Sequence, residues 1–285
     1  MLANSSVQVL IAGCGDLGCE LGRRLMQSGH TVLGLRRSAQ ALPHGIETIQ
    51  ADVTDINACQ ILQTLSPQIV VYCVAANAAT DESYQAHYVD GLHNVLSAIQ
   101  QSNLQHVFFV SSTRVYGQQV DALLDETVAA IPNDFGGERL SQGEKLLKTL
   151  TCKTTVLRLS GIYGPERTRM LRLASDVTKW PVNNSWSNRI HRDDAASFIH
   201  FLIDSVVHAK AVDDCYIVTD QLPTSQYEVL LWLADQLGVD TQSVHIPAIS
   251  GGKRLSSARM QASGFEFEYP TYQQGYTALL KSEQS

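Results

Sequence analysis

The stretch from Val7 to Gly18, VQVLIAGCGDLG, constrains this chain more than any other. Its first half is a short, uncharged, β-branched run, which is typical of a strand buried on both faces of a parallel sheet. Its second half places Gly13, Gly15 and Gly18 at G-x-G-x-x-G spacing, and apolar residues then continue at helical intervals. This order of strand, glycine turn and helix predicts the pyrophosphate-binding turn of a dinucleotide-binding fold.

Each residue of such a turn has a separate role. Gly13 permits the tight turn, Gly15 lets backbone N–H groups approach the pyrophosphate, and Gly18 lets the helix pack against the strand. Asp16 and Leu17 lie between the last two glycines, at the helix N-terminus that faces the anion. The alternative is an ordinary strand-to-helix turn, because a glycine triplet alone is a weak signal.

The end of the second predicted strand, 30–35, indicates which dinucleotide binds. An NAD site needs Asp or Glu roughly twenty residues after the glycines, to hold the ribose 2′-hydroxyl. This chain has Arg36, Arg37 and Ser38 at that place. Two guanidinium groups and a hydroxyl suit a 2′-phosphate, so the sequence favours NADP over NAD as cofactor. The alternative is a solvated basic loop.

Two further segments are expected to line the cofactor. The third predicted strand, 45–53, ends in Asp52 and Val53 at the carboxyl edge of the sheet, where ligands of open α/β sheets lie. Asp52 is suited equally to accept a hydrogen bond from an adenine amino group and to cap the next helix. A fourth buried strand, 68–76, ends in Ala75 and Ala76, whose small side chains would let a cofactor approach the backbone.

Bulk properties narrow the functional class. The chain has 285 residues, of which 44% are hydrophobic, which is ample for an α/β core. A net charge of -7 disfavours nonspecific nucleic-acid binding and anionic membrane surfaces. No span approaches the roughly eighteen apolar residues of a membrane helix, so we expect a cytoplasmic protein. The six cysteines have no C-x-x-C or metal-like spacing, so we expect no metal site.

The regular alternation of strands and helices predicts the architecture. Helices are expected over 56–65, 84–101, 193–207 and 225–237, and a fifth strand over 106–111. Ser225 is expected to cap the last of these helices, with Glu228 three residues on completing a capping box. No repeat or linker interrupts this pattern, which predicts a Rossmann-type doubly wound parallel sheet of the α/β class with a small C-terminal α/β substrate lobe. We place an NAD(P)-binding Rossmann domain at 1–159 and a substrate-binding lobe, interleaved with the sheet, at 160–285.

The segment SSTRVYG, 111–117, follows the fifth strand and resembles the SSxxVYG motif of the extended or atypical short-chain dehydrogenase/reductases. That group holds the NAD(P)-dependent sugar-nucleotide epimerases and dehydratases. The resemblance extends to the glycine turn and to VLRLSGIYGP and IHRDDAASFI, at 156–165 and 190–199. The run 253–280 is similar to the ending of an uncharacterised bacterial branch of atypical members. The resemblance implies an oxidoreductase that transfers a hydride.

The catalytic residues implied by the resemblance are only partly present. Relatives relay a proton through a Ser or Thr, and through a Tyr and a Lys spaced Y-x-x-x-K. Ser112 occupies the hydroxyl position, but Phe135 and Arg139 stand where the tyrosine and lysine should be. A phenyl ring has no proton to give, so a substitute acid is required. We favour Tyr116, or a water held by Arg139. The other tyrosines considered for the role are Tyr84 and Tyr163.

In relatives, the region that corresponds to 166–188 holds sugar and phosphate groups. Here it is rich in arginine and tryptophan, whose side chains suit such groups: Arg167, Arg169, Arg172, Trp180 and Trp186. The equally weighted alternative is a solvated loop with two core tryptophans. Close behind, His191 precedes Asp193 and Asp194, and we expect one aspartate to cap the following helix while His191 lines a cleft.

Two functions from different classes follow. The first is an NAD(P)-dependent, epimerase/dehydratase-like oxidoreductase that acts on a carbinol or ketone of a small molecule, for which a nucleotide sugar is the implied class. Thr113 and Arg114 replace the Asp-Glu pair of family dehydratases, which argues against sugar 4,6-dehydration. The second, motivated by Phe135 and Arg139, is a catalytically silent NADP(H)-binding sensor or regulatory module. The resemblance is also compatible with a homodimer.

Overall fold

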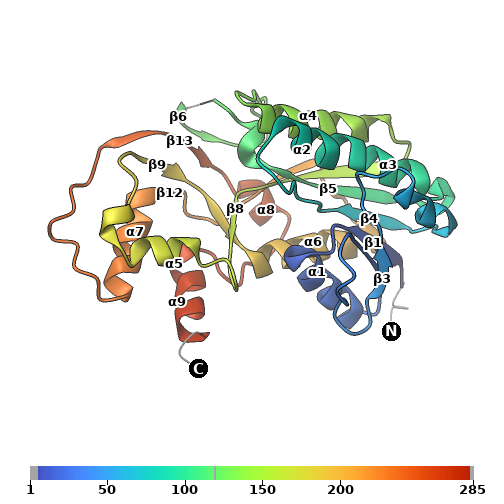
Figure 1. Cartoon of the computed structure of the whole chain (residues 1–285), viewed down its shortest axis with the longest axis horizontal. Coiled ribbons are helices and arrows are strands. Elements are labelled where there is room, and N and C mark those ends of the chain that lie inside the picture. Colours follow the sequence, from blue (N-terminus) through green and yellow to red (C-terminus); the bar gives the residue numbers. More distant parts are fainter. Residues whose placement is uncertain (1–5, 119, 283–285) are drawn as a thin grey trace. The chain divides into compact units, whose positions relative to one another are not determined.

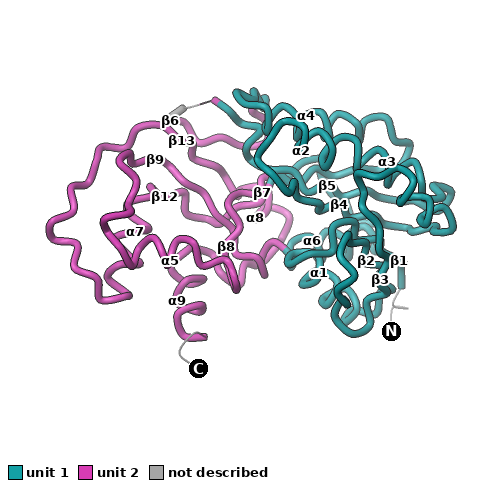
Figure 2. The backbone as a smooth tube through the Cα atoms, in the orientation of Figure 1, with its two compact units in different colours: residues 1–117, 129–158, 196–216 teal, residues 118–128, 159–195, 217–285 magenta. Residues whose placement is uncertain are grey.

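The computed structural model describes residues 6–118 and 120–282, which form two compact units (Figure 2). Unit 1 comprises 1–117, 129–158 and 196–216, and unit 2 comprises 118–128, 159–195 and 217–285. The chain changes unit between 158 and 159, beside the predicted division at 159/160. It also changes unit around 118–128 and 196–216, so the two units are interleaved along the sequence.

Unit 1 is built on a sheet that, in the described chain, has seven strands in the order β11-β7-β5-β4-β1-β2-β3. The pairs β1–β2, β1–β4, β2–β3 and β4–β5 are parallel. The final residues of β7 and β11 belong to unit 2. The strands are β1 (Gln8–Ala12), β2 (Thr31–Arg36), β3 (Glu47–Gln50), β4 (Ile69–Tyr72), β5 (His106–Ser112), β7 (Lys153–Leu159) and β11 (Cys215–Val218).

The strand order contains a reversal at β1. From β1 the chain adds β2 and β3 on one side and then returns to add β4 and β5 on the other. In open α/β sheets, ligands bind outside the carboxyl ends of the strands at such a switch point. The predicted Rossmann-type parallel sheet is confirmed, and the glycine turn after β1 lies at the switch point.

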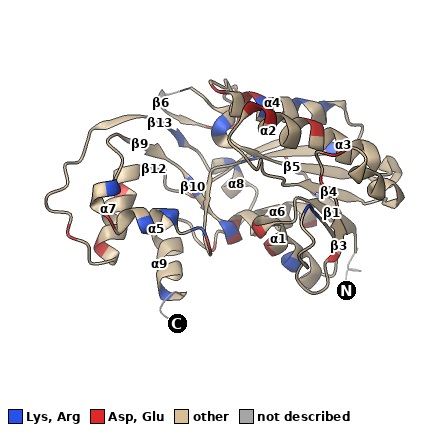
Figure 3. Ribbon diagram, in the orientation of Figure 1, with Lys and Arg blue, Asp and Glu red and all other residues tan. Residues whose placement is uncertain are grey.

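Helices cover both faces of this sheet in unit 1. The helix α1 (Asp16–Gln27) and the part of α6 (Arg192–Val207) in unit 1 lie on one face, and α2 (Asp81–Tyr84), α3 (Gly91–Ala98) and α4 (Phe135–Leu146) lie on the other (Figure 1). The central strands β1, β4 and β5 carry no charged residue (Figure 3). Because both faces are covered, these strands are apolar on both sides. Short turns follow at η3 (Gln101–Asn103), η4 (Thr113–Val115) and η5 (Leu147–Thr149).

Two predicted helices differ from the structure. The helix expected at 56–65 is a 3₁₀ helix, η1 (Ala58–Thr64). The helix expected at 84–101 begins at Asp81 and contains a π turn, η2 (Gln85–Asp90), between α2 and α3. The cause lies in the sheet: the hydroxyl of the fully buried Tyr72 donates a hydrogen bond to the carbonyl of His87, and so inserts beside the helix backbone.

Unit 2 contains a four-stranded sheet among its described residues, in the order β12-β9-β13-β6, and a parallel pair, β10–β8. The strands are β6 (Val120–Leu124), β8 (Gly161–Tyr163), β9 (Asn184–Ser187), β10 (Arg189–His191), β12 (Thr224–Ser225) and β13 (Ile249–Leu255). The helices are α5 (Arg169–Ala174), η6 (Val177–Lys179), α7 (Gln226–Gln236), α8 (Ala258–Ala262) and α9 (Tyr272–Ser282). Ser225 caps α7 as predicted, because its hydroxyl accepts a hydrogen bond from the N–H of Glu228 at 3.2 Å.

The core of unit 2 is aromatic. Trp180 packs edge-on against Tyr227, with ring centroids 5.6 Å apart, and Tyr163 stacks on Tyr276 at 4.4 Å. These four side chains are all buried. No helix within 6–118 or 120–282 has both the length and the apolar character needed to cross a membrane.

Candidate functional site

The three glycines of the turn after β1 have different surroundings. Gly13 has φ +90°, and a Cβ atom there would lie 2.6 Å from the backbone nitrogen of Val74. A Cβ at Gly18 would lie 3.0 Å from the carbonyl oxygen of Gly13 and 3.1 Å from Ile11. A Cβ at Gly15 would meet nothing nearer than 4.0 Å. Packing therefore requires glycine at position 13 and leaves little room for a side chain at Gly18, whereas Gly15 faces open space from which a ligand can reach the backbone.

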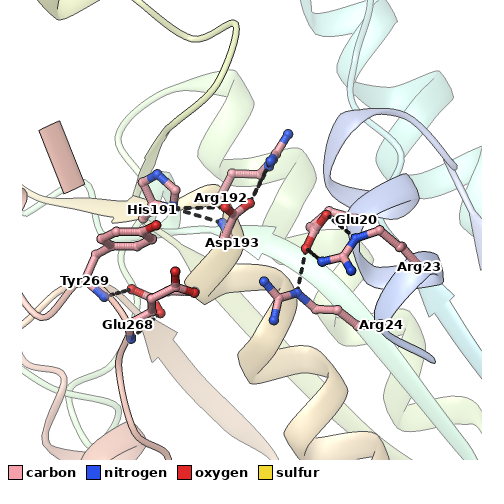
Figure 4. Close-up of polar contacts among 9 residues, drawn as sticks. Glu20, Arg23, Arg24, His191, Arg192, Asp193, Glu268 and Tyr269 are labelled. Atoms are coloured by element: carbon pink, nitrogen blue, oxygen red, sulfur yellow. Dashed lines mark hydrogen bonds and ion pairs between the residues drawn. The ribbon is translucent and has the colours of Figure 1, made fainter. Parts of the chain in front are cut away.

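The helix that follows the turn presents its N-terminus to that space. Gly15 is the N-cap of α1, and no side chain caps it. The first-turn N–H groups and the helix dipole therefore favour an anion there. Leu17 is buried, so only its backbone is available to a ligand, and Asp16 is half-buried. Farther along α1, Glu20 pairs with Arg23 and Arg24 at 2.6 and 2.7 Å, which keeps these charges on the helix surface (Figure 4).

Thiols surround the turn and are held as hydrogen-bond donors. Cys73 Sγ donates to the carbonyl of Gly13 at 3.3 Å, and Cys19 Sγ donates to the carbonyl of Cys14 at 3.6 Å. Burial raises the pKa of Cys73 to about 12 and raises the pKa of Cys14 still further. Both thiols are therefore protonated and fill space behind the turn. Within the described residues, no group of three His, Cys, Asp or Glu side chains is placed to hold a metal ion.

The basic residues at the end of β2 lie near the turn. Arg36 is close enough for its charge to act on Cys14. Its Nη2 donates weakly to Gln40 at 3.3 Å, and its Nε is buried with no hydrogen-bond partner among the described residues. Arg37 and Ser38 are exposed beside it. A buried, unpaired guanidinium N–H next to an anion-binding turn fits an additional phosphate group.

The remaining predicted cofactor contacts lie on the neighbouring strand ends. Asp52 Oδ1 accepts from the backbone N–H and the hydroxyl of Thr54, at 3.0 and 2.8 Å. Although burial opposes it, these hydrogen bonds hold the pKa of Asp52 below its ordinary value, so the carboxylate is charged. The N-cap of η1 is Asn57, so the alternative role of Asp52 as that cap is wrong. Val53 is buried. Just beyond β4, Ala75 is exposed and the next residue, Ala76, is half-buried.

The catalytic residues expected from the sequence each have hydrogen-bond partners of their own. Ser112 ends β5, and its hydroxyl accepts a hydrogen bond from the N–H of Arg114 at 3.2 Å. Tyr116 has no exposed surface, and its hydroxyl accepts a hydrogen bond from Arg158 at 2.7 Å. Arg139 is bound at both Nε and Nη2 by Asp81, at 2.7 and 2.8 Å, and so links α4 to α2. The geometry thus gives Tyr116 and Arg139 structural partners.

The partner of Tyr116 belongs to a buried ion pair that sequence reasoning missed. Arg158 on β7 binds both oxygens of Glu144, at 3.0 and 2.7 Å, and Ser111 donates to the same carboxylate at 2.7 Å. Burial alone would lower the pKa of Arg158, but the pair with Glu144 raises it above its ordinary value. The two side chains are 13% and 10% exposed, so this ion pair is nearly buried. This network ties α4 to β5 and β7.

The structure instead brings together Tyr84, Arg114 and Phe135. Arg114 Nη1 donates to the Tyr84 hydroxyl at 2.8 Å, and its Nε lies 2.9 and 3.0 Å from the two oxygens of Asp134. The guanidinium carbon lies 5.1 Å from the centroid of each aromatic ring. The two rings meet edge-on at 5.4 Å. The one sequence signal for this cluster was the pair of glycines after Phe135, since a side chain at Gly136 would overlap Arg114.

In unit 2, the residues from 191 to 194 differ from their predicted roles (Figure 4). Asp194 accepts hydrogen bonds from the backbone N–H groups of Glu268 and Tyr269, at 2.8 and 2.9 Å. His191 Nδ1 accepts from the N–H of Asp193 at 3.2 Å, and Asp193 binds Arg192. The predicted cap by Asp193 or Asp194 is therefore wrong. His191 is buried against Tyr269, with ring centroids 4.1 Å apart.

The arginine- and tryptophan-rich segment of unit 2 is divided between core and surface. Trp180 is buried and donates to the carbonyl of Leu173 at 3.0 Å, as the structural alternative expected. Trp186 is half-buried, with Arg254 lying 4.9 Å from its ring. The arginines around the start of α5 are exposed: Arg167, Arg169 and Arg172. These three side chains lie at the surface of unit 2.

Curated relatives are distant. The chain is 26% identical over 231 residues to the 3beta-hydroxysteroid-dehydrogenase/decarboxylase isoform 1 of Arabidopsis thaliana, covering 71% of this chain and 51% of that protein. It thus spans about half the length of that relative. It is 23% identical over 259 residues to the UDP-glucose 4-epimerase of Vibrio cholerae, covering 84% of this chain and 78% of that one.

A solved structure and a family model agree with the fold and the glycine turn. A protein of Methylobacillus flagellatus, whose description as an NAD-dependent epimerase/dehydratase is itself provisional, is 49% identical, with a TM-score of 0.91. The match covers 99% of this chain and all of the other. The model of the NAD dependent epimerase/dehydratase family matches residues 9–215. The resemblance found in the sequence is confirmed, and this chain belongs to the NAD-dependent epimerase/dehydratase family.

Proposed function

We propose that this protein is an oxidoreductase that prefers NADP(H) and transfers a hydride to or from a carbinol or ketone carbon of a nucleotide sugar. The observation that carries the proposal is the glycine turn with its open Gly15 and the unpaired Nε of Arg36 beside it. When bound, a nicotinamide dinucleotide supplies the hydride donor or acceptor. The backbone at Gly15 and the N-terminus of α1 hold its pyrophosphate.

The other residues of the site bind and orient. Arg36, Arg37 and Ser38 hold the 2′-phosphate, because guanidinium groups donate pairwise to phosphate oxygens. Asp52 and Val53 flank the adenine, with the charged Asp52 accepting from its amino group. The cofactor wall beyond β4 is formed by Ala75 and Ala76. The Ser112 hydroxyl orients the substrate oxygen at the end of β5.

The substrate class rests on relatives and on charge. The Vibrio cholerae relative is named for a nucleotide sugar, and the Arabidopsis relative for a hydroxysteroid. Both names refer to a substrate that carries a secondary carbinol, which is the group that hydride transfer interconverts with a ketone. The exposed Arg167, Arg169 and Arg172 favour the nucleotide sugar, because a diphosphate would pair with arginines and a sterol would not. We also propose that the protein is a cytoplasmic homodimer. Analytical ultracentrifugation would measure the mass of the assembly and so test the dimer.

Calorimetric titration with NADPH and NADH tests the cofactor. We expect NADPH to bind at least tenfold more tightly, a difference of about 1.4 kcal/mol. The double variant Arg36→Ala/Arg37→Ala should lose this preference, while Arg23→Ala, an exposed arginine farther along α1, should keep it. Equal affinities in the wild type would reject the 2′-phosphate assignment. If neither dinucleotide binds, the oxidoreductase proposal fails.

A second function, the silent NADP(H) sensor, is favoured by one observation. Arg139, which stands at the lysine position, donates two hydrogen bonds to Asp81 and is unavailable for the family's usual proton relay. Incubation with NADP+ or NADPH and a panel that includes UDP-glucose and its 4-keto derivative separates the two functions. Reduction or oxidation of the nicotinamide supports the oxidoreductase function. Tight NADPH binding with no turnover across the panel supports the sensor.

A further inference from the structure

The hydroxyl of Tyr84 has an unusual hydrogen-bonding position. Arg114 Nη1 donates to it at 2.8 Å, and a guanidinium group can only donate. The oxygen of Tyr84 is therefore the acceptor, and its own proton is left for another partner. Among the described residues, no protein group accepts that proton. Tyr84 is half-buried, so an exogenous acceptor can reach it.

The guanidinium that holds Tyr84 is itself fixed on several sides. Asp134 binds its Nε through both carboxylate oxygens, and Asp134 is fixed in turn as the N-cap of α4, where it accepts from the N–H of Gly137 at 2.8 Å. Phe135 packs against the guanidinium with its centroid 5.1 Å away. Gly136 has no side chain, which leaves the space that the guanidinium occupies. Arg114 is thus preorganised and needs no rearrangement to hold a phenolic oxygen.

The backbone around Tyr84 is also specialised. The π turn η2 begins directly after it and is set by the hydroxyl of the fully buried Tyr72. Single π turns inside helices occur frequently at functional sites. The Tyr84 ring lies 5.2 Å from that of Tyr88, whose hydroxyl bonds the backbone of Ala76, just beyond β4. Arg114 follows Ser112 at the end of the neighbouring β5. Tyr84 therefore lies at the carboxyl ends of β4 and β5.

The other proton-bearing groups near these strand ends in unit 1 have structural partners. Tyr116 is fully buried and bonded to Arg158, and Glu144 is paired with the same arginine. The Tyr88 oxygen accepts from the backbone N–H of Ala76, and burial raises the pKa of Tyr88 above its ordinary value, so this tyrosine releases its proton less readily. Among these groups, Tyr84 is half-buried, its oxygen is held by a fixed cation, and its proton has no protein partner among the described residues.

We propose that Tyr84, held by Arg114, is the catalytic acid and base of this protein and supplies the hydroxyl that Phe135 lacks. This assignment rests on the proposed function. In the reducing direction, the carbonyl carbon accepts a hydride from the reduced nicotinamide, which is oxidised, and the carbonyl oxygen accepts the Tyr84 proton. The C=O double bond becomes a C–O single bond, and the phenolate remains beside the Arg114 cation until solvent reprotonates it. The oxidising direction is the reverse.

The test compares Tyr84→Phe with a variant that moves the hydroxyl to the neighbouring ring. Arg114 lies 5.1 Å from both ring centroids, and Tyr84→Phe/Phe135→Tyr is designed to put a phenolic oxygen on the second ring that contacts this guanidinium. We expect Tyr84→Phe to lower kcat by about 100-fold or more with KM and NADPH affinity unchanged. The swapped double variant should recover a substantial part of the loss. A merely structural role for Tyr84 predicts no such recovery.

A second measurement needs no substrate turnover. Nitration by tetranitromethane, followed by peptide mass spectrometry, reports the accessibility of each tyrosine. We expect Tyr84 to be modified and NADPH together with UDP to protect it, while the modification of Tyr269, a half-buried tyrosine of unit 2, is unaffected. If the cofactor binds but leaves the nitration of Tyr84 unchanged, the assignment is wrong.

The outcomes separate the two proposals. Normal turnover by Tyr84→Phe, or a loss in Tyr116→Phe alone, overturns the Tyr84 assignment and leaves the oxidoreductase proposal standing. Absence of NADPH and NADH binding in the wild type, measured before any variant is made, overturns both. Loss of kcat in Tyr84→Phe with recovery in the swapped variant supports both.

Discussion

Gly13 and Val74 approach so closely that a single methyl group at Gly13 would lie 2.6 Å from the backbone nitrogen of Val74. This contact joins the turn after β1 to the end of β4, on the two sides of the switch point in the sheet. A side chain at Gly13 would push these segments apart. The cofactor turn and the central sheet therefore depend on the same glycine.

Gly13→Ala should consequently destabilise the fold, while Gly15→Ala should not. At Gly13 the energetic penalties of the φ of +90° and of the steric overlap add together. We therefore expect the free energy of unfolding to fall by more than the roughly 1–2 kcal/mol that a left-handed conformation costs a non-glycine residue. At Gly15 a methyl group meets open space, and the expected effect is weaker NADPH binding at nearly unchanged stability. Urea unfolding and calorimetry measure the two quantities.

Gly238→Ala is the matched control for strain alone. Gly238 has φ +68°, and a Cβ there would meet nothing within 4 Å. Its replacement should cost only the conformational penalty, about 1–2 kcal/mol. Equal losses at Gly13 and Gly238 would show that the overlap with Val74 relaxes without cost.

The Arg158–Glu144 pair should behave as a buried ion pair. Arg158→Met leaves the nearly buried Glu144 carboxyl group without its cationic partner, so we expect a loss of about 3–5 kcal/mol in the free energy of unfolding. Arg158→Met/Glu144→Leu should recover much of that loss, because no unpaired charge remains. The more exposed Arg139–Asp81 pair, with side chains 27% and 44% exposed, is the control, and Arg139→Met should have a much smaller effect. A double variant no more stable than the single one would contradict this account.

Asp220 should make the stability of unit 2 depend on pH. Burial raises the pKa of Asp220 to about 7, although Arg189 nearby opposes the shift, and Oδ2 has no hydrogen-bond partner among the described residues. In the unfolded chain the pKa of an aspartate is about 3.9. Between about pH 4 and pH 7 the folded state therefore keeps a proton that the unfolded state has lost. Its contribution to stability falls as pH rises, by up to about 1.4 kcal/mol per pH unit.

Asp220→Asn removes this titration. The amide oxygen can still accept from the N–H of Leu222, which bonds Asp220 Oδ1 at 3.2 Å in the wild type. We expect the variant to lose stability less steeply than the wild type between pH 4 and pH 7, with the advantage of the variant greatest near pH 7. Thermal unfolding across this range measures the difference. Parallel pH profiles would show that Asp220 is ionised in the folded state.

Tyr72→Phe tests the link between the sheet and the π turn. Removal of the hydroxyl leaves the carbonyl of His87 without its buried donor, so we expect a loss of about 1–3 kcal/mol in the free energy of unfolding. Because η2 follows Tyr84 directly, the variant should also lower the rate of the proton-dependent step. Unchanged turnover in a destabilised Tyr72→Phe protein would mean that the π turn does not position Tyr84.

The sequence by itself determined the features that depend on neighbouring residues. The glycine spacing after β1, the parallel-strand pattern and the Ser225 cap were all predicted, because steric and hydrogen-bonding preferences act over a few residues. The 3₁₀ form of η1 and the π turn were not predicted from the sequence. The π turn depends on a hydroxyl from β4, fifteen positions away from the carbonyl that it bonds.

Only the tertiary structure decided which polar groups meet. Arg114 reaches Tyr84 across 30 positions, Arg158 reaches Tyr116 across 42, and Asp194 reaches Glu268 across 74. No local pattern specifies such pairs, because they depend on how strands and helices stack. The sequence thus located the cofactor turn, which is one continuous segment. It left the catalytic tyrosine open, because that choice depends on which hydroxyl is buried, which is bonded and which is free.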